Sequence, residues 1–500
     1  MLTISSLSLL AEAASVTVSP GDDLTALTSS LQAGDVVTFE PGIYLLESTV
    51  YWSGVGTEDA PIALRSRNEG DEVVLQTSGG GYVAEVLDSA YLTLSGLTFE
   101  SSNTTTGYGG YSNPSGLYIG GANMNVTVEN CVVRNVYGTG LRIDGNGTGL
   151  LIRHNEVHST IEGSGIYVGT WDGAQWLQNS TITNNLVHDV QGTGIYLSNG
   201  SQGVKLSDNV VFSVRDDGIY LGSTNFGPEN VVTGNAVWQT GYDGLHVEGT
   251  SLIQNNIVFL TGEEGIETVN SGDFDGLTSV HISHNTFALT GGWAAYLGDF
   301  YDREGMVFSN NALANPTGYG LWWEDLYQPE TSYGSGGYYE TQTANYITNN
   351  VVTGLVDGFD PFARPEFIIL GGGVADFVDI ELFDFYPSPG SLLRNAGDAN
   401  GEAYIPAVDF NGTPRNGAAP TVGAYEYDGE GNPGWVLGDT FKVVQPGGDR
   451  SDTALSTGCC GGGGSTSTTQ AAFLLPFLTV MVGRRRIPRR NCPPGRGVRQ

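Results

Sequence analysis

The hydrophobic positions of this chain follow a repeated phrase: a glycine, an aliphatic residue, any residue and a second aliphatic residue. Between residues 115 and 358 the phrase begins at Gly116, Gly140, Gly165, Gly194, Gly218, Gly244, Gly265 and Gly320. Strict alternation of period two predicts short strands with one buried face, and the Gly, Asn and Asp residues between them supply turns. The pattern therefore predicts a chain made of many short strands rather than helices.

An asparagine, usually in the form Asn-x-Val, follows each copy of the phrase. The asparagines are Asn130, Asn155, Asn185, Asn209, Asn235, Asn256, Asn285, Asn311 and Asn350, separated by 21 to 39 residues. Such a period is typical of solenoids, in which each repeat packs only on its neighbours. A side chain that both donates and accepts hydrogen bonds can link the same turn of successive coils.

These features resemble the asparagine ladder of right-handed parallel β-helices, the pectate-lyase-like superfamily. The resemblance covers roughly residues 16–430. It implies an all-β fold, a right-handed parallel β-helix with N- and C-terminal caps, followed by a flexible linker and a short apolar tail.

The predicted boundaries follow from composition and from local resemblances. Residues 1–15 are Leu-rich and end in small residues, although they lack a basic start, and are predicted to be a shortened export signal. Residues 16–100 would form the N-terminal cap and first coils, and residues 101–358 the repeats. Within 359–428, the segments 409–415 and 422–426 resemble a module that closes bacterial surface β-helices, so this region is predicted to be the C-terminal cap.

The last 72 residues have a different composition. Residues 429–470 are rich in Gly, Pro, Ser and Thr and are predicted to be a flexible linker. Residues 471–500 combine an apolar run with an arginine cluster after Cys459 and Cys460, which resembles the C-terminal sorting tags of myxobacterial-type proteins. The resemblance implies a secreted or outer-membrane-associated bacterial surface protein that contacts membrane only through this tail. An ordinary disordered tail is the alternative.

The formal charge of the 500-residue chain is −34. Because the arginines from Arg484 onward have no acidic counterpart, residues 1–483 alone carry −41. Such a field disfavours nucleic acid and any polyanion that arrives without a bridging cation. A neutral glycan, or an acidic glycan bound through Ca²⁺, remains compatible with it. The four cysteines form no disulfide or zinc pattern, and Cys131 is predicted to be a buried structural thiol.

The variable residue of each phrase is expected to point outward and to align along the solenoid. The substrate-binding residues predicted in this column are Arg142, Tyr167, Tyr196, Tyr220, Glu267, Tyr296 and Trp322. His246, which lies between Tyr220 and Glu267 in the same column, is instead a predicted catalytic residue. Aromatic faces at regular spacing suit a polysaccharide, since sugar rings present C–H faces to them. The alternative is that tyrosine simply favours outward β positions.

Carboxylates precede the glycine in three consecutive coils. The predicted catalytic residues are Asp216, Asp217, Asp243, Glu264 and His246, with Glu248 nearby. Like charges one coil apart raise a pKa or require a cation, so Asp217, Asp243 and Glu264 are also predicted as a metal site for which Ca²⁺ is the candidate, although hydrolysis requires no cofactor. The alternative for these acids is a solvated turn.

Two functions stay open from the sequence. The first is a surface protein that binds polysaccharide and cleaves it as a glycoside hydrolase. A lyase is less favoured, because the only well-placed basic residue, Arg142, lies roughly 19 Å from the coil of His246 at the usual strand spacing. The second is a non-catalytic adhesin or structural envelope protein that displays the same groove.

Overall fold

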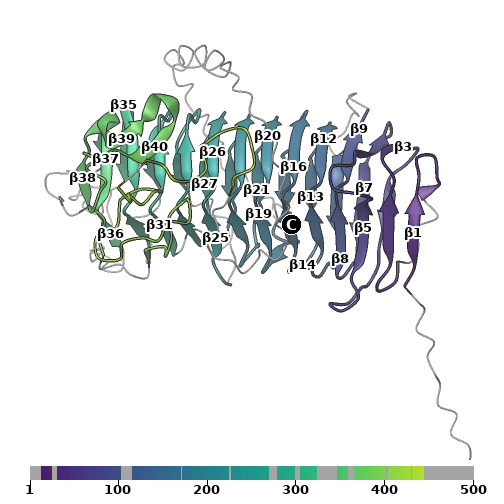
Figure 1. The fold of residues 1–500 in the computed structure, drawn as a ribbon. Coiled ribbons are helices and arrows are strands. Elements are labelled where there is room, and N and C mark those ends of the chain that lie inside the picture. Colours follow the sequence, from purple (N-terminus) through teal and green to yellow (C-terminus); the bar gives the residue numbers. More distant parts are fainter. Residues whose placement is uncertain are drawn as a thin grey trace, which may run out of the picture. The chain divides into compact units, whose positions relative to one another are not determined.

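The computed structural model describes residues 13–24, 31–102, 115–170, 172–223, 227–269, 277, 279–298, 305–323, 346–358, 365, 367–399, 404–429 and 431–443. The regular secondary structure of these residues is almost entirely short parallel strands that wind into coils (Figure 1). The predicted solenoid of parallel strands is confirmed. The predicted linker beyond residue 443 and the predicted sorting tail lie outside the described residues, as does the export signal except for residues 13–15.

Each full coil contributes one strand to each of three faces, which are numbered from the strand that contains the Gly-aliphatic-x-aliphatic phrase. Face 1 consists of β4 (Val50–Trp52), β7 (Tyr82–Leu87), β10 (Ser115–Gly120), β13 (Leu141–Ile143), β17 (Ile166–Val168), β21 (Ile195–Leu197), β24 (Ile219–Leu221), β27 (Leu245–Val247), β30 (Ile266–Thr268) and β33 (Trp293–Leu297).

Face 2 is a 13-stranded sheet. Its strands are β1 (Ser15–Val18), β2 (Val36–Phe39), β5 (Ile62–Ser66), β8 (Leu92–Ser95), β11 (Thr127–Glu129), β15 (Leu151–Arg153), β19 (Thr181–Thr183), β22 (Lys205–Ser207), β25 (Asn230–Thr233), β28 (Ser251–Gln254), β31 (Val280–Ser283), β34 (Val307–Ser309) and β36 (Tyr346–Thr348).

Face 3 follows face 2 after a short turn. Its strands are β3 (Gly42–Leu46), β6 (Val73–Thr77), β9 (Thr98–Ser101), β12 (Val132–Val136), β16 (Glu156–Thr160), β20 (Leu186–Val190), β23 (Val210–Val214), β26 (Ala236–Thr240), β29 (Ile257–Phe259), β32 (Thr286–Ala288) and β38 (Ile368–Leu370), with β35 (Ala312–Trp323) and β37 (Asn350–Asp357) continuing from face 3 into face 1.

Smaller elements complete the described chain. The two-residue strands β14 (Gly147–Thr148) and β18 (Leu177–Gln178) pair in a loop layer between faces 1 and 2. Beyond the coils lie the 3₁₀ turns η2 (Gly373–Asp376) and η3 (Ile380–Leu382) and the antiparallel pair β39 (Phe377–Asp379) and β40 (Asp384–Pro387). Within the described residues, no helix has the length and apolar character that a membrane crossing requires.

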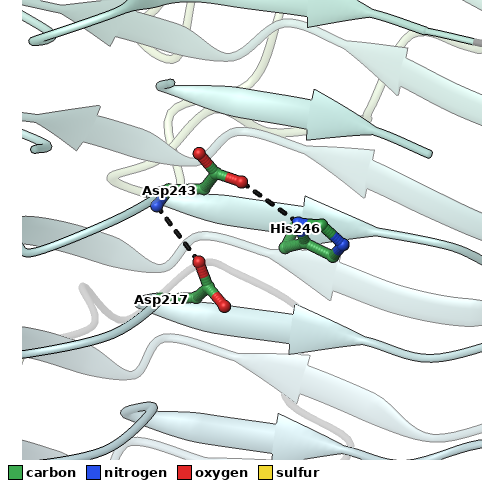
Figure 2. Close-up of side chains that lie close together, drawn as sticks. All are labelled: Asp217, Asp243 and His246. Carbon is green, nitrogen blue, oxygen red and sulfur yellow. Dashed lines mark hydrogen bonds and ion pairs between the residues drawn. The ribbon is translucent and has the colours of Figure 1, made fainter. Parts of the chain in front are cut away.

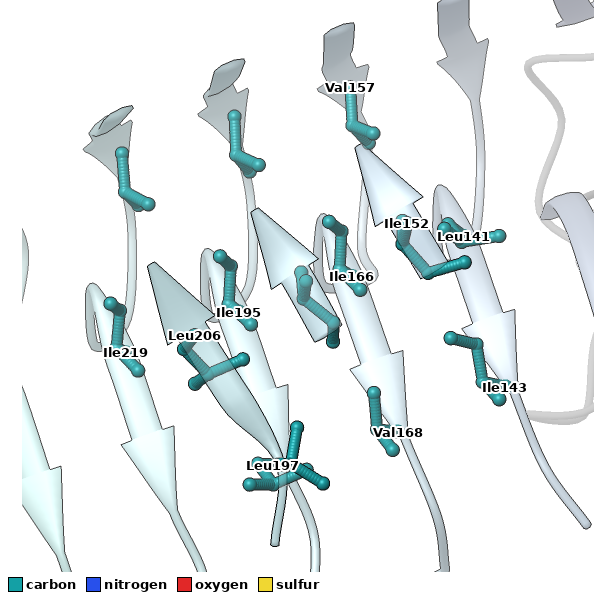
Figure 3. Packing of buried hydrophobic residues seen from close by; sticks show 14 of the residues in the cluster. Leu141, Ile143, Ile152, Val157, Ile166, Val168, Ile195, Leu197, Leu206 and Ile219 are labelled. Atoms are coloured by element: carbon teal, nitrogen blue, oxygen red, sulfur yellow. The ribbon is translucent and has the colours of Figure 1, made fainter. Parts of the chain in front are cut away.

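The aliphatic residues of the repeated phrase fill the inside of the coils. Leu141, Ile166, Ile195 and Ile219 pair in register on successive strands and are almost completely buried, as Figure 3 shows. The glycine of the repeated phrase marks a close approach between coils. At Gly194 a Cβ atom would lie 2.3 Å from Val211 Cγ1 and 2.6 Å from the carbonyl oxygen of Gly218. Any larger residue there would push neighbouring coils apart.

The predicted asparagine ladder lies in the turn between faces 2 and 3. The backbone N–H and the Nδ2 of Asn185 each donate to Asn209 Oδ1 at 3.0 Å, and Asn185 Nδ2 also donates to the carbonyl of Ile152 at 2.9 Å. The same pattern continues to Asn350. These buried amides satisfy backbone groups that would otherwise lack partners in the tight turn.

The predicted ladder is wrong at its first position, Asn130. The ladder position there is held by Cys131, whose backbone N–H donates to Asn155 Oδ1 at 3.0 Å, while Asn130 is the preceding residue with φ 53°. Asparagine is favoured at two adjacent positions of the turn. At the first it tolerates the left-handed backbone, and at the second its side chain links successive coils. The sequence pattern alone therefore did not separate the two positions. Cys131 is buried, as predicted, and burial raises the pKa of its thiol to about 12.

The left-handed residue before each ladder position forms a second column, named here the turn column. Its members are Asn130, His154, Asn184, Asp208, Gly234, Asn255, His284, Asn310 and Asn349. From Asn184 onward, most of these side chains bind the described residues between 396 and 443, named here the clasp. Asn349 and Asn255 donate to the carbonyls of Ala396 and Val408, and Asn184 donates to that of Lys442.

Residues 377–393 and the clasp together cover the outer side of face 3 with a second hydrophobic core. Phe212, Trp238 and Phe259 stack on successive strands, and Phe385 packs against Phe259 with ring centroids 5.1 Å apart. Lys442, in the first part of the predicted linker, is buried and pairs with Asp208 at 2.7 Å. The flexible linker predicted to begin at residue 429 therefore does not cover residues 431–443, which belong to the clasp.

Candidate functional site on face 1

The outward column of face 1 aligns side chains from eight successive strands. Paired positions run through Arg142, Tyr167, Tyr196, Tyr220, His246, Glu267, Tyr296 and Trp322. The local cause is the alternation in each strand, which buries the flanking aliphatics and leaves the middle side chain half-buried on the outside for most of these strands. The sequence-predicted column is therefore one continuous surface.

The aromatic rings of this column lie face to face. The ring centroids of Tyr167 and Tyr196 are 4.7 Å apart, those of Tyr196 and Tyr220 4.4 Å, and those of Tyr220 and His246 4.7 Å, with planes within 6° of parallel. The expectation that these tyrosine faces are open to sugar rings does not hold for Tyr196 and Tyr220, because both faces of each ring are covered by neighbours. The column offers ring edges and hydroxyl groups instead.

Arg142 lies at the other end of this stack, four strands from His246. Its Nε donates to Asp144 Oδ2 at 2.6 Å, and its guanidinium carbon lies 5.1 Å from the centroid of the Tyr167 ring. Asp144 was missed from the sequence, although the same alternation places it on the same side of the chain as Arg142. Because Arg142 and His246 are four strands apart, they do not act on one sugar unit.

The carboxylates before the glycines form a ladder of their own. Asp217 Oδ1 accepts the backbone N–H of Asp243 at 3.1 Å (Figure 2). Asp243 Oδ1 accepts the backbone N–H of Glu264, also at 3.1 Å. Each acid therefore satisfies the turn of the next coil with one oxygen. The second oxygen of Asp217 does not bond this turn, and the Glu264 carboxylate hydrogen-bonds the side chain of Asp243 instead of a backbone group of the next coil. These are the groups that face the outside of the turn with oxygen atoms available for chemistry.

His246 lies among three carboxylates. Its Nδ1 is 3.0 Å from Asp243 Oδ2 and 3.4 Å from Glu267 Oε2, and its Nε2 is 3.5 Å from Glu248 Oε1. Figure 2 shows the Asp243 contact, which joins the turn to the outward column. The imidazole side chain is only 16% exposed, and that of Asp243 is 4% exposed.

Burial and neighbouring charges together raise the pKa values of the groups in this cluster. Burial raises the pKa values of Asp217 and Glu264, with Glu267 adding repulsion at both. Burial, reinforced by the carboxylates of Glu267 and Glu264, raises the pKa of Asp243 to about 8 against the hydrogen bond from His246. Burial alone would lower the pKa of His246, yet its bonds to the three carboxylates raise it to about 12. The cluster holds protons more tightly than separated groups would.

Of the predicted catalytic residues, Asp216 stays apart from this cluster. Its carboxylate pairs with Arg215 at 3.1 Å on the exposed side of the turn. The predicted metal set of Asp217, Asp243 and Glu264 does not form one group either. Among the described residues, the sets spaced closely enough for one ion are Asp217–Asp243–His246 and Asp243–Glu263–Glu264.

The raised pKa of Asp243 predicts a pH-dependent stability. The folded state holds this proton more tightly than the unfolded state, so the stabilisation is complete below the ordinary carboxyl pKa and is lost as the pH rises towards 8. We expect the wild type to lose a few kcal/mol of unfolding free energy across this window, at about 1.4 kcal/mol per pKa unit, and Asp243→Asn to lose less. Urea unfolding at both ends of the window measures the difference. Equal losses in the two proteins would contradict the assignment.

Two family models match the coils. The model described as "Right handed beta helix region" matches residues 76–237, and the model described as "Periplasmic copper-binding protein (NosD)" matches residues 173–352. The chain is a right-handed parallel β-helix. The second match includes the strand that carries His246. A comparison with curated proteins gave no match.

Solved structures with this fold include enzymes that act on polysaccharides. The A-module of mannuronan C-5 epimerase AlgE6 from Azotobacter vinelandii is 16% identical over 65% of this chain and 90% of its own, with a TM-score of 0.51. The AlgE4 A-module from the same organism is 14% identical over 68% and 91%, with a TM-score of 0.50. Pectate lyase Pel9A is 15% identical over 83% and 96%, with a TM-score of 0.46. The similarities to the two epimerase modules describe the fold of the β-helix.

The copper-binding name of the second family model can be tested against the residues in the β-helix. The four imidazoles within the match lie apart: His246 on face 1, His188 on face 3, His281 on face 2 and His284 in the turn column. Copper favours several imidazole or sulfur ligands. The described face 1 cluster instead offers one imidazole, with both nitrogens directed at carboxylates, and oxygen donors. These residues do not fit a copper site.

Proposed function

We propose that face 1 binds a polysaccharide whose chain runs along the coils, and that Asp217 and Glu264 hydrolyse it by acid–base catalysis. The single observation that carries this proposal is the register on face 1. It brings a row of half-buried tyrosines and a row of protonatable carboxylates to neighbouring positions on consecutive strands.

The tyrosine hydroxyls supply the binding surface. Because the rings of Tyr167, Tyr196 and Tyr220 stack with a spacing close to that of the strands, their hydroxyl groups form a row of donors and acceptors parallel to the coil axis. A polymer with hydroxyl groups along its length matches such a row better than a compact ligand does. Tyr296 and Trp322, whose centroids lie 4.2 Å apart, extend the surface on the other side of His246. The similarity in fold to mannuronan C-5 epimerase modules is compatible with a polysaccharide ligand.

The carboxylate spacing favours inversion. Asp217 and Glu264 occupy equivalent positions two strands apart, which is roughly 9–10 Å along the axis at the usual strand spacing. Carboxyl groups about 6.5–9.5 Å apart leave room for a water in inverting glycosidases. One carboxylic acid gives its proton to the glycosidic oxygen as the C–O bond breaks. The other, as carboxylate, takes a proton from the water that attacks the anomeric carbon.

Asp243 and His246 are positioning residues in this proposal. Both oxygens of Asp243 are engaged, one by the Glu264 N–H and the other by His246. Its side chain is also too deeply buried to meet a substrate. The pair therefore fixes Glu264 and the turn rather than exchanging protons with the sugar.

Elimination is less well supported than hydrolysis. A lyase needs a base beside the uronate, and a tyrosine can serve only if its pKa falls. Burial and the neighbouring Glu248 carboxylate instead raise the pKa of Tyr220 far above its usual value. Arg142, four strands away, is paired with Asp144. The periplasmic family name and the predicted export signal support a location outside the cytoplasm for this activity.

A panel of neutral and acidic polysaccharides tests the proposal. We expect new reducing ends with at least one neutral glycan and no ultraviolet absorbance from unsaturated sugars. Unsaturated products would establish a lyase instead. Binding without turnover, weakened by the double change Tyr196→Phe and Tyr220→Phe, would support the non-catalytic adhesin. If no glycan in the panel is bound or cleaved, face 1 is not a polysaccharide-binding groove.

A further inference from the structure

We propose that a pocket at the N-terminal end of face 1, named here the N-terminal pocket, binds a neutral sugar ring between the exposed side chain of Tyr51 and the carboxylate of Asp88. Tyr51 lies on β4, six strands before the strand of Tyr220, which is roughly 29 Å along the axis at the usual strand spacing. The pocket is therefore separate from the acid ladder, and the inference does not depend on whether the protein hydrolyses a glycan.

Three segments of the first coils line the N-terminal pocket, which has a volume of about 520 Å³. Tyr51 comes from β4 and Leu87 from the end of β7. Leu31, from the chain before β2, forms a parallel bridge with Gly54 on the far side of the pocket from β7. Volumes of about 300–1,000 Å³ are typical of sites for small molecules, so the pocket has room for a sugar ring.

Tyr51 offers an aromatic face that other tyrosines of the outward column do not. The column continues from Arg142 through Tyr118 and Glu85 to Tyr51. No described strand of face 1 lies beyond β4, and no other described ring stacks on Tyr51, which is 49% exposed. The faces of Tyr196, by contrast, are covered by its neighbours. An open phenol ring is the surface on which the C–H face of a sugar packs.

Asp88 supplies an acceptor whose direction is fixed. Its Oδ1 accepts the backbone N–H of Ala122, on the next coil, at 2.8 Å. Among the described residues, none donates to Oδ2, and the side chain is exposed where it lines the pocket. Hydrogen bonds to an ionised carboxylate are stronger than those between neutral groups. Because the carboxylate is already held in place, a sugar hydroxyl can donate to it at little further cost in side-chain freedom.

The charge around the N-terminal pocket favours a neutral sugar. Asp88 lines it, Glu85 follows Tyr51 in the column, and no lysine or arginine is among the described residues that line it. An acidic sugar would meet these carboxylates in a strongly acidic chain without a basic partner. A neutral ring instead has hydroxyl donors for Asp88 and an apolar face for Tyr51 and for Val55, which is also exposed in the pocket.

An array of neutral and acidic oligosaccharides, followed by calorimetric titration with the neutral oligosaccharide that binds best, tests this inference. We expect Tyr51→Ala to bind that oligosaccharide at least about tenfold more weakly than wild type, and Tyr51→Phe, which keeps the ring, to stay within about threefold. Asp88→Asn, with a neutral acceptor, should bind more weakly than wild type. Tyr242→Ala is the matched control, because Tyr242 is 50% exposed outside the pocket. Equal Tm values exclude a folding defect.

Equal affinity of wild type and Tyr51→Ala would overturn the inference, and so would a wild type that binds acidic oligosaccharides alone or none on the array. The double change Tyr196→Phe and Tyr220→Phe distinguishes the pocket from the proposed groove. Binding that this double variant keeps and Tyr51→Ala loses supports the pocket. Binding that the double variant loses and Tyr51→Ala keeps supports the groove alone and refutes the pocket.

Discussion

Replacement of Arg415 by methionine is expected to lower the free energy of unfolding by about 3–5 kcal/mol, the usual cost of removing one partner from a buried charged network. Arg415 is the centre of the clasp, with its side chain 1% exposed. Its Nη2 donates to Asn255 Oδ1 at 2.7 Å and to the carbonyls of Gly423 and Ala424 at 2.9 Å. Methionine fills a similar volume but leaves these acceptors, and the Glu426 carboxylate, without their donor.

A lower Tm and earlier proteolysis of the clasp are the measured consequences. Arg67→Met is the control, because Arg67 pairs with Glu40 at the surface and is 52% exposed, so its loss should change stability by less than about 1 kcal/mol. If Arg415→Met unfolds like wild type while the control does too, the clasp does not stabilise the coils. A loss confined to the clasp, with the coils melting unchanged, would mean that the second core is energetically separate.

The sequence predicts the coils well because their geometry repeats. Each coil must satisfy the same contacts, so Gly194 and its equivalents recur wherever backbones approach, and the ladder asparagines recur wherever the turn needs a donor and an acceptor. One departure, Cys131, lies at the N-terminal end of the ladder. Asn155 accepts the backbone N–H of Cys131 and donates to the carbonyl of Val128, so it needs no asparagine side chain at position 131. Because these structural requirements repeat in every coil, the residues that meet them repeat in the sequence.

The clasp could not be predicted in the same way. Its bonds join residues up to 258 positions apart, as between Asn184 and Lys442, and each contact occurs once. The turn column varies between Asn, Asp, His and Gly because the backbone requires only a left-handed conformation, while the side chain is fixed by whatever segment of the clasp lies over it. His284, for example, lies beside the carbonyl of Thr421 and is kept neutral by burial, which lowers its pKa.

The candidate site could be predicted from the sequence only in part. Alternation was enough to align Tyr196, Tyr220 and His246, because it fixes which side chains share a face. It could not predict how the rings turn. Since parallel strands are spaced about as far apart as stacked aromatic rings prefer, neighbouring tyrosines cover each other's faces. The same reasoning explains why the Asp243 carboxylate is occupied by the backbone of the next coil rather than free.

If the proposed hydrolysis is correct, Asp217→Asn and Glu264→Gln are each expected to reduce kcat by roughly 10²–10⁴-fold, the range for loss of one general acid or base. Both changes keep the shape of the side chain, and the amide oxygen in Asp217→Asn can still accept the Asp243 N–H. KM should change little, because the tyrosine row is untouched. Initial rates of reducing-end release on the glycan that the wild type cleaves measure the effect.

The pH profile separates the two roles. Since burial raises both carboxyl pKa values, the wild-type rate should fall on the alkaline side at a higher pH than ordinary carboxyls allow, as the proton-donating acid is lost. Whichever variant removes the acid should flatten that alkaline limb, and the other should flatten the acidic limb. Asp216→Asn is the matched control: its carboxylate pairs with Arg215 outside the cluster, and we expect nearly wild-type rates from it. Full activity in either Asp217→Asn or Glu264→Gln would refute that residue's catalytic role and return the acid ladder to a structural part in the turns.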